Sequence, residues 1–212
     1  MTIPTDPLQP TDGWLQADPP RILPPPPAER GVAFRTVSRA SRWFGRKQLP
    51  NVFPVFHVNP RLFWPWLWFA SRLMPFGRLD APTREKLILR TAWNCRSHYE
   101  WMQHVEIGLR TGLTDADILY VAGRQAPPPD PRDASLRDAC DDICRHHPVA
   151  DATWAALAAH YDAAALIEIT VLVGHYLMVA ALLVNAGVQV ETDAEAVLAA
   201  FHARVAPALA RH

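Results

Sequence analysis

Proline is concentrated at the N-terminal end of this chain, and that concentration excludes regular structure there. Of the 212 residues, 21 are proline, and the first cluster runs from Pro4 to four consecutive prolines that end at Pro27. Proline fixes φ and lacks an amide donor, so this segment can form neither a helix nor a central strand. We therefore predict that residues 1–30 form an extended arm. The arm is either a disordered tail or a strap across a partner subunit, and a recognition motif is the less favoured alternative.

The remainder, residues 31–212, carries helical patterns and no alternation of the kind that predicts a sheet. Asp80 is a candidate N-cap for the first clear helix, and Thr114 with Asp117 has the spacing of a capping box for a later one. Helices are predicted within residues 79–94, 99–112, 113–123, 134–147, 151–161 and 163–187. The last of these is apolar nearly all round, which indicates a central or interface helix. We predict one all-α domain.

Composition excludes several classes of function. Lysine plus arginine equals aspartate plus glutamate at 21 each, so no overall charge attracts nucleic acid or an anionic membrane. The N-terminus lacks the pattern of a secretory signal, and the apolar run 62–70 is too short to span a bilayer. Three cysteines do not make a disulfide framework. These features predict a cytoplasmic protein that binds neither nucleic acid nor membrane.

The stretch Asn94–His104, "NCRSHYEWMQH", gathers side chains that could form an active site. Glu100 and His104 are four residues apart and so share one face of a helix, although such a pair is often only a solvated surface. Ser97 and Glu100 have the spacing of a capping box, which is a structural alternative for both residues. The aromatic side chains of Tyr99 and Trp101 are compatible both with packing in the core and with binding a substrate.

Glu85, Ser97, Glu100 and His104, within "EKLILRTA", "SHYEWMQH" and "GLTDAD", resemble the signature of the carboxymuconolactone decarboxylase family. This family also includes the AhpD-type alkylhydroperoxidases, and the resemblance covers most of residues 50–190. It implies an AhpD-like helical bundle, assembled as a homo-oligomer such as a trimer or hexamer. It also implies a small-molecule substrate in a reaction that uses neither a metal nor an organic cofactor.

The family's peroxidase branch places a Cys-x-x-Cys pair between its glutamate and its histidine. Ser97 and Glu100 occupy those two positions here. Dithiol peroxide reduction needs one thiolate to attack and a second thiol to resolve, so this sequence argues against peroxidase activity at these positions. Cys95 lies two residues before the first position and has no Cys-x-x-Cys partner, which favours a small buried residue.

The residues that remain form an acid–base set. We expect His104 to act as general acid/base, Glu85 to orient it, and Glu100 to serve as a second acid/base group. The residues expected to contact the substrate are Ser97 and Tyr99, as hydrogen-bond donors, together with Trp101, His175, Cys95 and His98. The chemistry would be decarboxylation, or hydrolysis or isomerisation of a lactone. A thiol-dependent alkylhydroperoxidase and a non-catalytic oligomeric binding protein are the alternatives.

Three further features leave alternatives open. His175 lies in a very apolar helix, with Glu168 two turns away as a candidate hydrogen-bond partner. Cys140 and Cys144 share a helix face, but their spacing from the nearby histidines does not fit zinc, so we predict no metal site and leave a redox role open. The aromatic run 61–76 forms either an apolar wall over the site or a subunit interface.

Overall fold

The computed structural model describes residues 8–40, 49–125, 128 and 130–210. Within these residues the chain forms ten α-helices and one short 3-10 helix, and its sole strand-like pairing is an isolated bridge between Leu15 and Ser97. The elements are η1 (Pro27–Glu29), α1 (Val32–Ala40), α2 (Val52–Phe56), α3 (Pro60–Leu73), α4 (Ala81–Asn94), α5 (His98–Arg110), α6 (Asp115–Val121), α7 (Pro131–Cys144), α8 (Asp151–Ala158), α9 (Ala163–Ala186) and α10 (Thr192–Leu209). The prediction of an all-α fold is confirmed.

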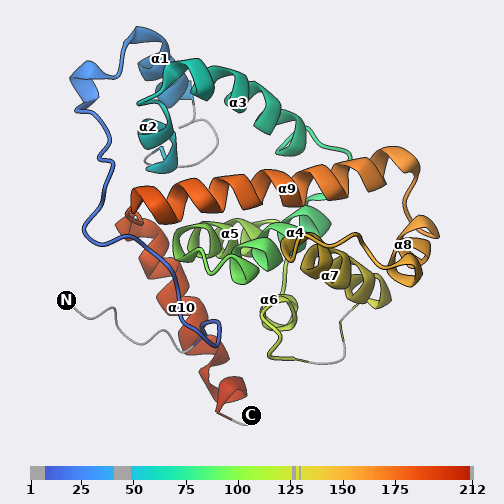
Figure 1. Cartoon of the computed structure of the whole chain (residues 1–212). Coiled ribbons are helices and arrows are strands. Elements are labelled where there is room, and N and C mark those ends of the chain that lie inside the picture. Colours follow the sequence, from blue (N-terminus) through green and yellow to red (C-terminus); the bar gives the residue numbers. More distant parts are fainter. Residues whose placement is uncertain (1–7, 41–48, 126–127, 129, 211–212) are drawn as a thin grey trace.

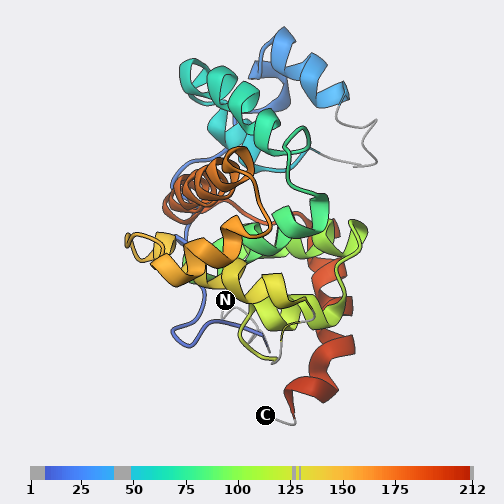
Figure 2. The same cartoon turned by 90° about the vertical axis from the view of Figure 1, so that its right-hand side faces the viewer.

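The long helix α9 separates two groups of helices. In Figure 1, α1, α2 and α3 lie above α9, and α4, α5 and α7 lie below it. Figure 2 shows the same order of layers from the side. Helix α4 contacts α5, α7 and α9, so it is the central element of the lower group.

The N-caps that the sequence predicts for α4 and α6 are present in the structure. The Asp80 carboxylate accepts a hydrogen bond from the backbone amide of Thr83 at 3.0 Å, at the start of α4. Thr114 and Asp117 form the reciprocal capping box of α6. Helix α7 begins earlier than predicted, because Asp130 caps it and Pro131 suits its first position.

Helix α9 is long and apolar enough to cross a membrane by length and composition. In the structure it packs against α3, α4, α5 and α7, and 44% of its most apolar window is buried. Contact with helices above and below therefore accounts for part of its apolar character, while Ile167 at 65% and Met178 at 43% remain exposed. This confirms the prediction of a central helix.

The N-terminal segment packs along its own domain, so the prediction of a disordered tail is wrong for residues 8–22. Leu8 is fully buried, and Trp14 packs edge-on against Trp93 with ring centroids 5.5 Å apart. The backbone amide of Ala17 donates to the carbonyl of Val184 at 3.0 Å. The sequence feature that indicates this packing is the presence of Leu8 and Trp14 among the prolines, because large apolar side chains gain free energy when they are buried in a core. Residues 1–7 of the predicted arm lie outside the described residues.

Gly187 allows this intramolecular strap, residues 8–22, to lie close to the end of α9. It ends the helix in the left-handed region at φ +69°, where glycine is unstrained. A Cβ at this position would collide with the carbonyl oxygen of Ala17 and crowd the Cα of Pro20. Both the turn and the close approach of the strap therefore require glycine.

Candidate active site

Glu85 and His104 meet between α4 and α5. Nδ1 of His104 donates to Oε2 of Glu85 at 2.7 Å, which leaves Nε2 as the nitrogen available to a reactant. Glu85 is fully buried and His104 is 7% exposed. Nε of Arg84 approaches the other oxygen of Glu85 at 3.4 Å, so the carboxylate lies between a guanidinium and an imidazole. Sequence reasoning missed the buried Arg84, although it directly precedes Glu85.

Glu100 lies one turn before His104 on α5 and faces the interior. Its side chain is 2% exposed, and neither carboxyl oxygen has a hydrogen-bond partner among the described residues. Burial, together with negative charge on Cys144, raises the pKa of Glu100 well above its usual range. Burial therefore favours the neutral carboxylic acid form of Glu100, which is the form that can donate a proton.

The predicted capping box of Ser97 and Glu100 is wrong. Ser97 stands at the N-cap position of α5, but its hydroxyl makes no hydrogen bond to the helix and is fully buried. The reason is that Glu100 turns inward, towards α4 and α9, and so cannot reach back to the backbone amide of Ser97. Two buried polar groups at the start of α5 are consequently left without partners in the described part of the chain, which is unusual outside a functional site.

Tyr176 on α9 completes the surroundings of His104, and sequence reasoning missed it. Its ring meets the imidazole of His104 edge-on, with centroids 5.1 Å apart. Burial raises the pKa of Tyr176 well above its usual range, and the charges of Glu85 and Glu100 raise it further. The phenol is therefore neutral. The sequence feature that could have identified Tyr176 is its position directly after His175 in an apolar helix.

His175 lies against α3 and not against its predicted partner. Its ring stacks on Trp66 with centroids 6.1 Å apart and contacts Phe69 at 5.6 Å. Nδ1 has no hydrogen-bond partner among the described residues, and burial lowers the pKa of His175 to about 4. The imidazole is therefore neutral at pH 7 and lies one ring contact, through Tyr176, from His104.

The predicted pairing of His175 with Glu168 is wrong, because Glu168 is engaged in the turn after α3. Its carboxylate accepts backbone hydrogen bonds from Arg78 at 2.8 Å and from Leu79 at 3.0 Å. Gly77 lies so close to this carboxylate that a Cβ there would clash with it. Glu168 thus anchors the link between α3 and α4 and is not part of the site.

Three other residues predicted to contact substrate point away from His104. Trp101 is fully buried against Trp14 and Trp93, at ring distances of 5.8 and 5.1 Å. The ring of His98 packs on Trp14 as well, at 5.4 Å. The phenol of Tyr99 donates to Glu191 at 2.8 Å at the start of α10. Since successive residues of a helix point about 100° apart, only one face of α5 can serve the site.

Two of the three cysteines lie together at the end of α7. Cys144, the last residue of α7, lies 4.0 Å from Cys140, sulfur to sulfur. Cys95, the C-cap of α4, is the third cysteine; it is partly exposed, so the expectation of a small buried residue is wrong for it. Among the described residues no group of three or more histidine, cysteine, aspartate or glutamate side chains has the arrangement that would hold a metal ion.

Known proteins resemble this chain in structure and not detectably in sequence. No family model matches it, and no curated protein matches it. The debrominase Bmp8 in complex with 2,3,4-tribromopyrrole superposes with a TM-score of 0.72 at 15% identity, over 85% of this chain and 96% of that one. A peroxidase-related protein from Silicibacter sp. TM1040 gives a TM-score of 0.73 at 14% identity, over 84% and 95% of the two chains.

A third solved structure covers a smaller part of the chain. The Agrobacterium tumefaciens protein ATU0492, described as a putative antioxidant defence protein AhpD, has a TM-score of 0.59 at 18% identity. It covers 64% of this chain and 94% of its own. Identities this low establish the fold alone. The chain therefore adopts the AhpD-like helical fold of the carboxymuconolactone decarboxylase type.

Proposed function

We propose that this chain is a cofactor-independent acid–base enzyme that acts on a small or medium organic acid or lactone. One observation supports the proposal: a buried Glu85–His104 hydrogen bond of 2.7 Å lies one helical turn from Glu100, a buried carboxyl group that has no hydrogen-bond partner within the described segments. Paired titratable groups whose environments differ this much are typical of acid–base sites. Decarboxylation is the leading reaction.

His104 would supply the proton that decarboxylation needs. As CO₂ leaves, the electron pair of the broken C–C bond moves into the unsaturated lactone, and Nε2–H of the imidazolium then protonates the carbon. Glu85 holds the ring through Nδ1 and stabilises its positive charge. The neutral acid Glu100 would hydrogen-bond to a developing oxyanion or return the proton to His104. The same groups would also serve hydrolysis or isomerisation of a lactone.

We expect the substrate to be small and flat because of the side chains around His104. The side chains around it are aromatic: Tyr176 meets His104 directly, and Trp66 and Phe69 lie beyond it against His175. The structural neighbour Bmp8 binds a small ring, tribromopyrrole, in the same fold. Because His104 is only 7% exposed, aromatic side chains must move aside to admit a substrate, and they then exclude water around it.

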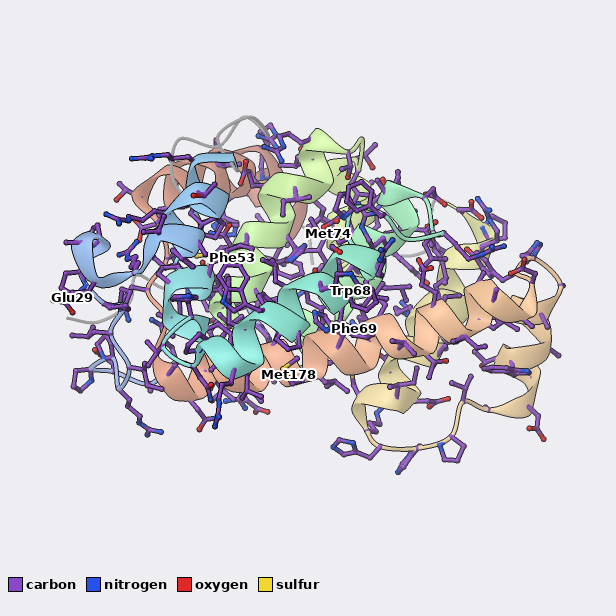
Figure 3. The ribbon with its side chains drawn as sticks, turned by 90° about the horizontal axis from the view of Figure 1, so that it is seen from above. Glu29, Phe53, Trp68, Phe69, Met74 and Met178 are labelled. Carbon is purple, nitrogen blue, oxygen red and sulfur yellow. The ribbon has the colours of Figure 1, made fainter. Side chains whose placement is uncertain are left out.

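We further propose a homo-oligomer, a trimer or hexamer, in the cytoplasm. The outer side of α3 exposes large apolar side chains, including Trp68 at 65% and Leu62 at 59%. Figure 3 shows Trp68 and Phe69 on α3 above Met178 of α9. Apolar surface of this kind is typical of subunit contacts. Trp68→Lys should therefore lower the mass measured by light scattering after gel filtration, whereas an unchanged mass would place the interface elsewhere.

The proposed activity is tested with His104→Gln, which fills a similar volume. Candidate carboxylated lactones and related acids are screened for CO₂ release and for lactone opening. The variant should lose turnover of the identified substrate by about 10²–10⁴-fold while keeping its circular dichroism spectrum and oligomeric mass. His147→Gln is the control, because His147 is exposed in the loop after α7. Full activity in the His104 variant would rule out the acid–base mechanism.

A further inference from the structure

Tyr176 carries a hydroxyl group that the mechanism proposed above does not use. Its ring meets the imidazole of His104 edge-on, with centroids 5.1 Å apart, and the residue is 8% exposed. Burial raises the pKa of Tyr176 first, and the charges of Glu85 and Glu100 raise it further, so the hydroxyl lies within electrostatic range of both carboxyl groups. A neutral phenol keeps its proton and can donate it in a hydrogen bond.

The hydroxyl of Tyr176 donates to a weak acceptor, because it meets Sδ of Met74 at 3.5 Å. A thioether accepts hydrogen bonds poorly, and the unbranched side chain of methionine adapts easily to a new neighbour. Met74 is the C-cap of α3 and is partly exposed (Figure 3). A carbonyl oxygen is a stronger acceptor than this sulfur, so a substrate that displaces Met74 gains the phenol as a donor.

Two other hydroxyl groups that the sequence suggests as donors are directed elsewhere. The phenol of Tyr99 donates to Glu191 at 2.8 Å. Ser97 stands at the N-cap of α5, seven residues before His104, and seven residues of helix rise about 10 Å. Tyr176, in contrast, has its ring directly against the imidazole of His104.

We propose that Tyr176 is the oxyanion donor of the site, and that its hydroxyl leaves Met74 to bind a carbonyl oxygen of the substrate. The inference rests on the acid–base function proposed above. As CO₂ leaves, the electron pair of the broken C–C bond moves through the conjugated system onto that oxygen. The hydrogen bond from Tyr176 strengthens as negative charge grows there. Nε2–H of His104 then protonates the carbon, the carbonyl group re-forms, and Glu100 returns a proton to His104.

This role of Tyr176 narrows the substrate class. The acid that loses CO₂ carries a carbonyl oxygen conjugated with the reacting carbon, since the phenol can stabilise only charge that reaches an oxygen. A carboxylated unsaturated lactone meets this condition, whereas a saturated acid without a second carbonyl group does not. The saturated analogue should therefore show no CO₂ release with this protein.

Tyr176→Phe removes the hydroxyl and keeps the ring against His104. The variant should lower kcat by about 10²–10³-fold and leave KM within about twofold. KM changes little because, in the ground state, the phenol exchanges one hydrogen bond for another. Tyr120→Phe is the matched control and should keep the wild-type kcat: Tyr120 on α6 is 2% exposed, and its hydroxyl has no partner among the described residues. A wild-type kcat in Tyr176→Phe would overturn the proposal.

Met74→Leu keeps the volume of the side chain and removes its sulfur acceptor. The phenol of Tyr176 then has no hydrogen bond to give up when the substrate binds, so KM should fall by about two- to fivefold. This gain should vanish when Tyr176→Phe is added. A residue that served only for packing would leave KM unchanged or raise it, and either result would refute the exchange of acceptors at Tyr176.

A binding measurement separates this inference from the proposed function. 2-Furoate, a flat ring acid, offers a carboxylate oxygen to the phenol and is titrated into the full-length protein in a calorimeter. Met74→Leu should bind it about two- to fivefold more tightly than the wild type does. Equal affinities, or no binding to either protein, overturn the inference whatever the turnover assays show. Turnover retained by His104→Gln refutes the acid–base function, whereas turnover lost in His104→Gln and retained in Tyr176→Phe refutes the role of Tyr176 alone.

Discussion

Glu100 gives a prediction that needs no substrate. In the unfolded chain a glutamate ionises with a pKa of about 4.3, whereas burial raises the pKa of Glu100 in the folded protein. Between these two values the unfolded state has released a proton that the folded state keeps. Stability must therefore fall as pH rises through this window, by about 1.4 kcal/mol per pH unit. The slope ends where folded Glu100 itself ionises.

Glu100→Gln removes this slope while keeping the shape of the neutral acid. The free energy of unfolding is measured in urea from pH 5 upwards for both proteins. The free energy of unfolding of the glutamine variant, relative to that of the wild type, should rise by about 1.4 kcal/mol per pH unit. Glu106→Gln, on the same helix, is the control, because its carboxylate is partly exposed and pairs with Arg110 at 3.4 Å. Parallel curves for wild type and Glu100→Gln would show that Glu100 ionises as easily in the folded protein as in the unfolded chain.

Three further substitutions test separate parts of the structure. Glu85→Gln should lower kcat by about 10²–10⁴-fold without unfolding the chain, because the imidazole loses its charged partner; an unchanged kcat would remove Glu85 from the mechanism. Glu168→Ala leaves the amides of residues 78–79 without their acceptor and should cost about 1–2 kcal/mol in urea unfolding. Trp14→Ala should cost about 2–4 kcal/mol and speed tryptic cleavage at Arg21, and unchanged cleavage would mean that the strap is held by other contacts.

Sequence patterns that span only a few residues predicted the helix caps correctly. Asp80 and Thr114 cap their helices as expected, since a cap and its amide are three residues apart. The pair Glu85 and His104 was reached through family resemblance, and the structure brings them together across two adjacent helices. The spacing of Glu85 and His104 in the sequence could not by itself predict this contact, because the angle between α4 and α5 is set by tertiary packing.

The predictions that failed concern the direction in which a side chain points and the distance between two side chains in space. Glu100 was expected at a helix cap and instead points inward, which the capping-box pattern cannot reveal. Glu168 was matched to His175 two turns away, but seven residues of helix rise about 10 Å, too far for a hydrogen bond.

The strap also has a consequence for the order of folding. Its amides pair with carbonyls near the other end of the sequence, such as Ala17 with Val184 and Arg21 with Ala186. A ribosome adds about 5–20 residues per second, so the strap waits on the order of ten seconds or more until α9 is made. The first described segment to be synthesised is therefore among the last to find its binding partners. Until then the backbone amides of Ala17 and Arg21 lack these partners, and this segment remains available to chaperones and proteases.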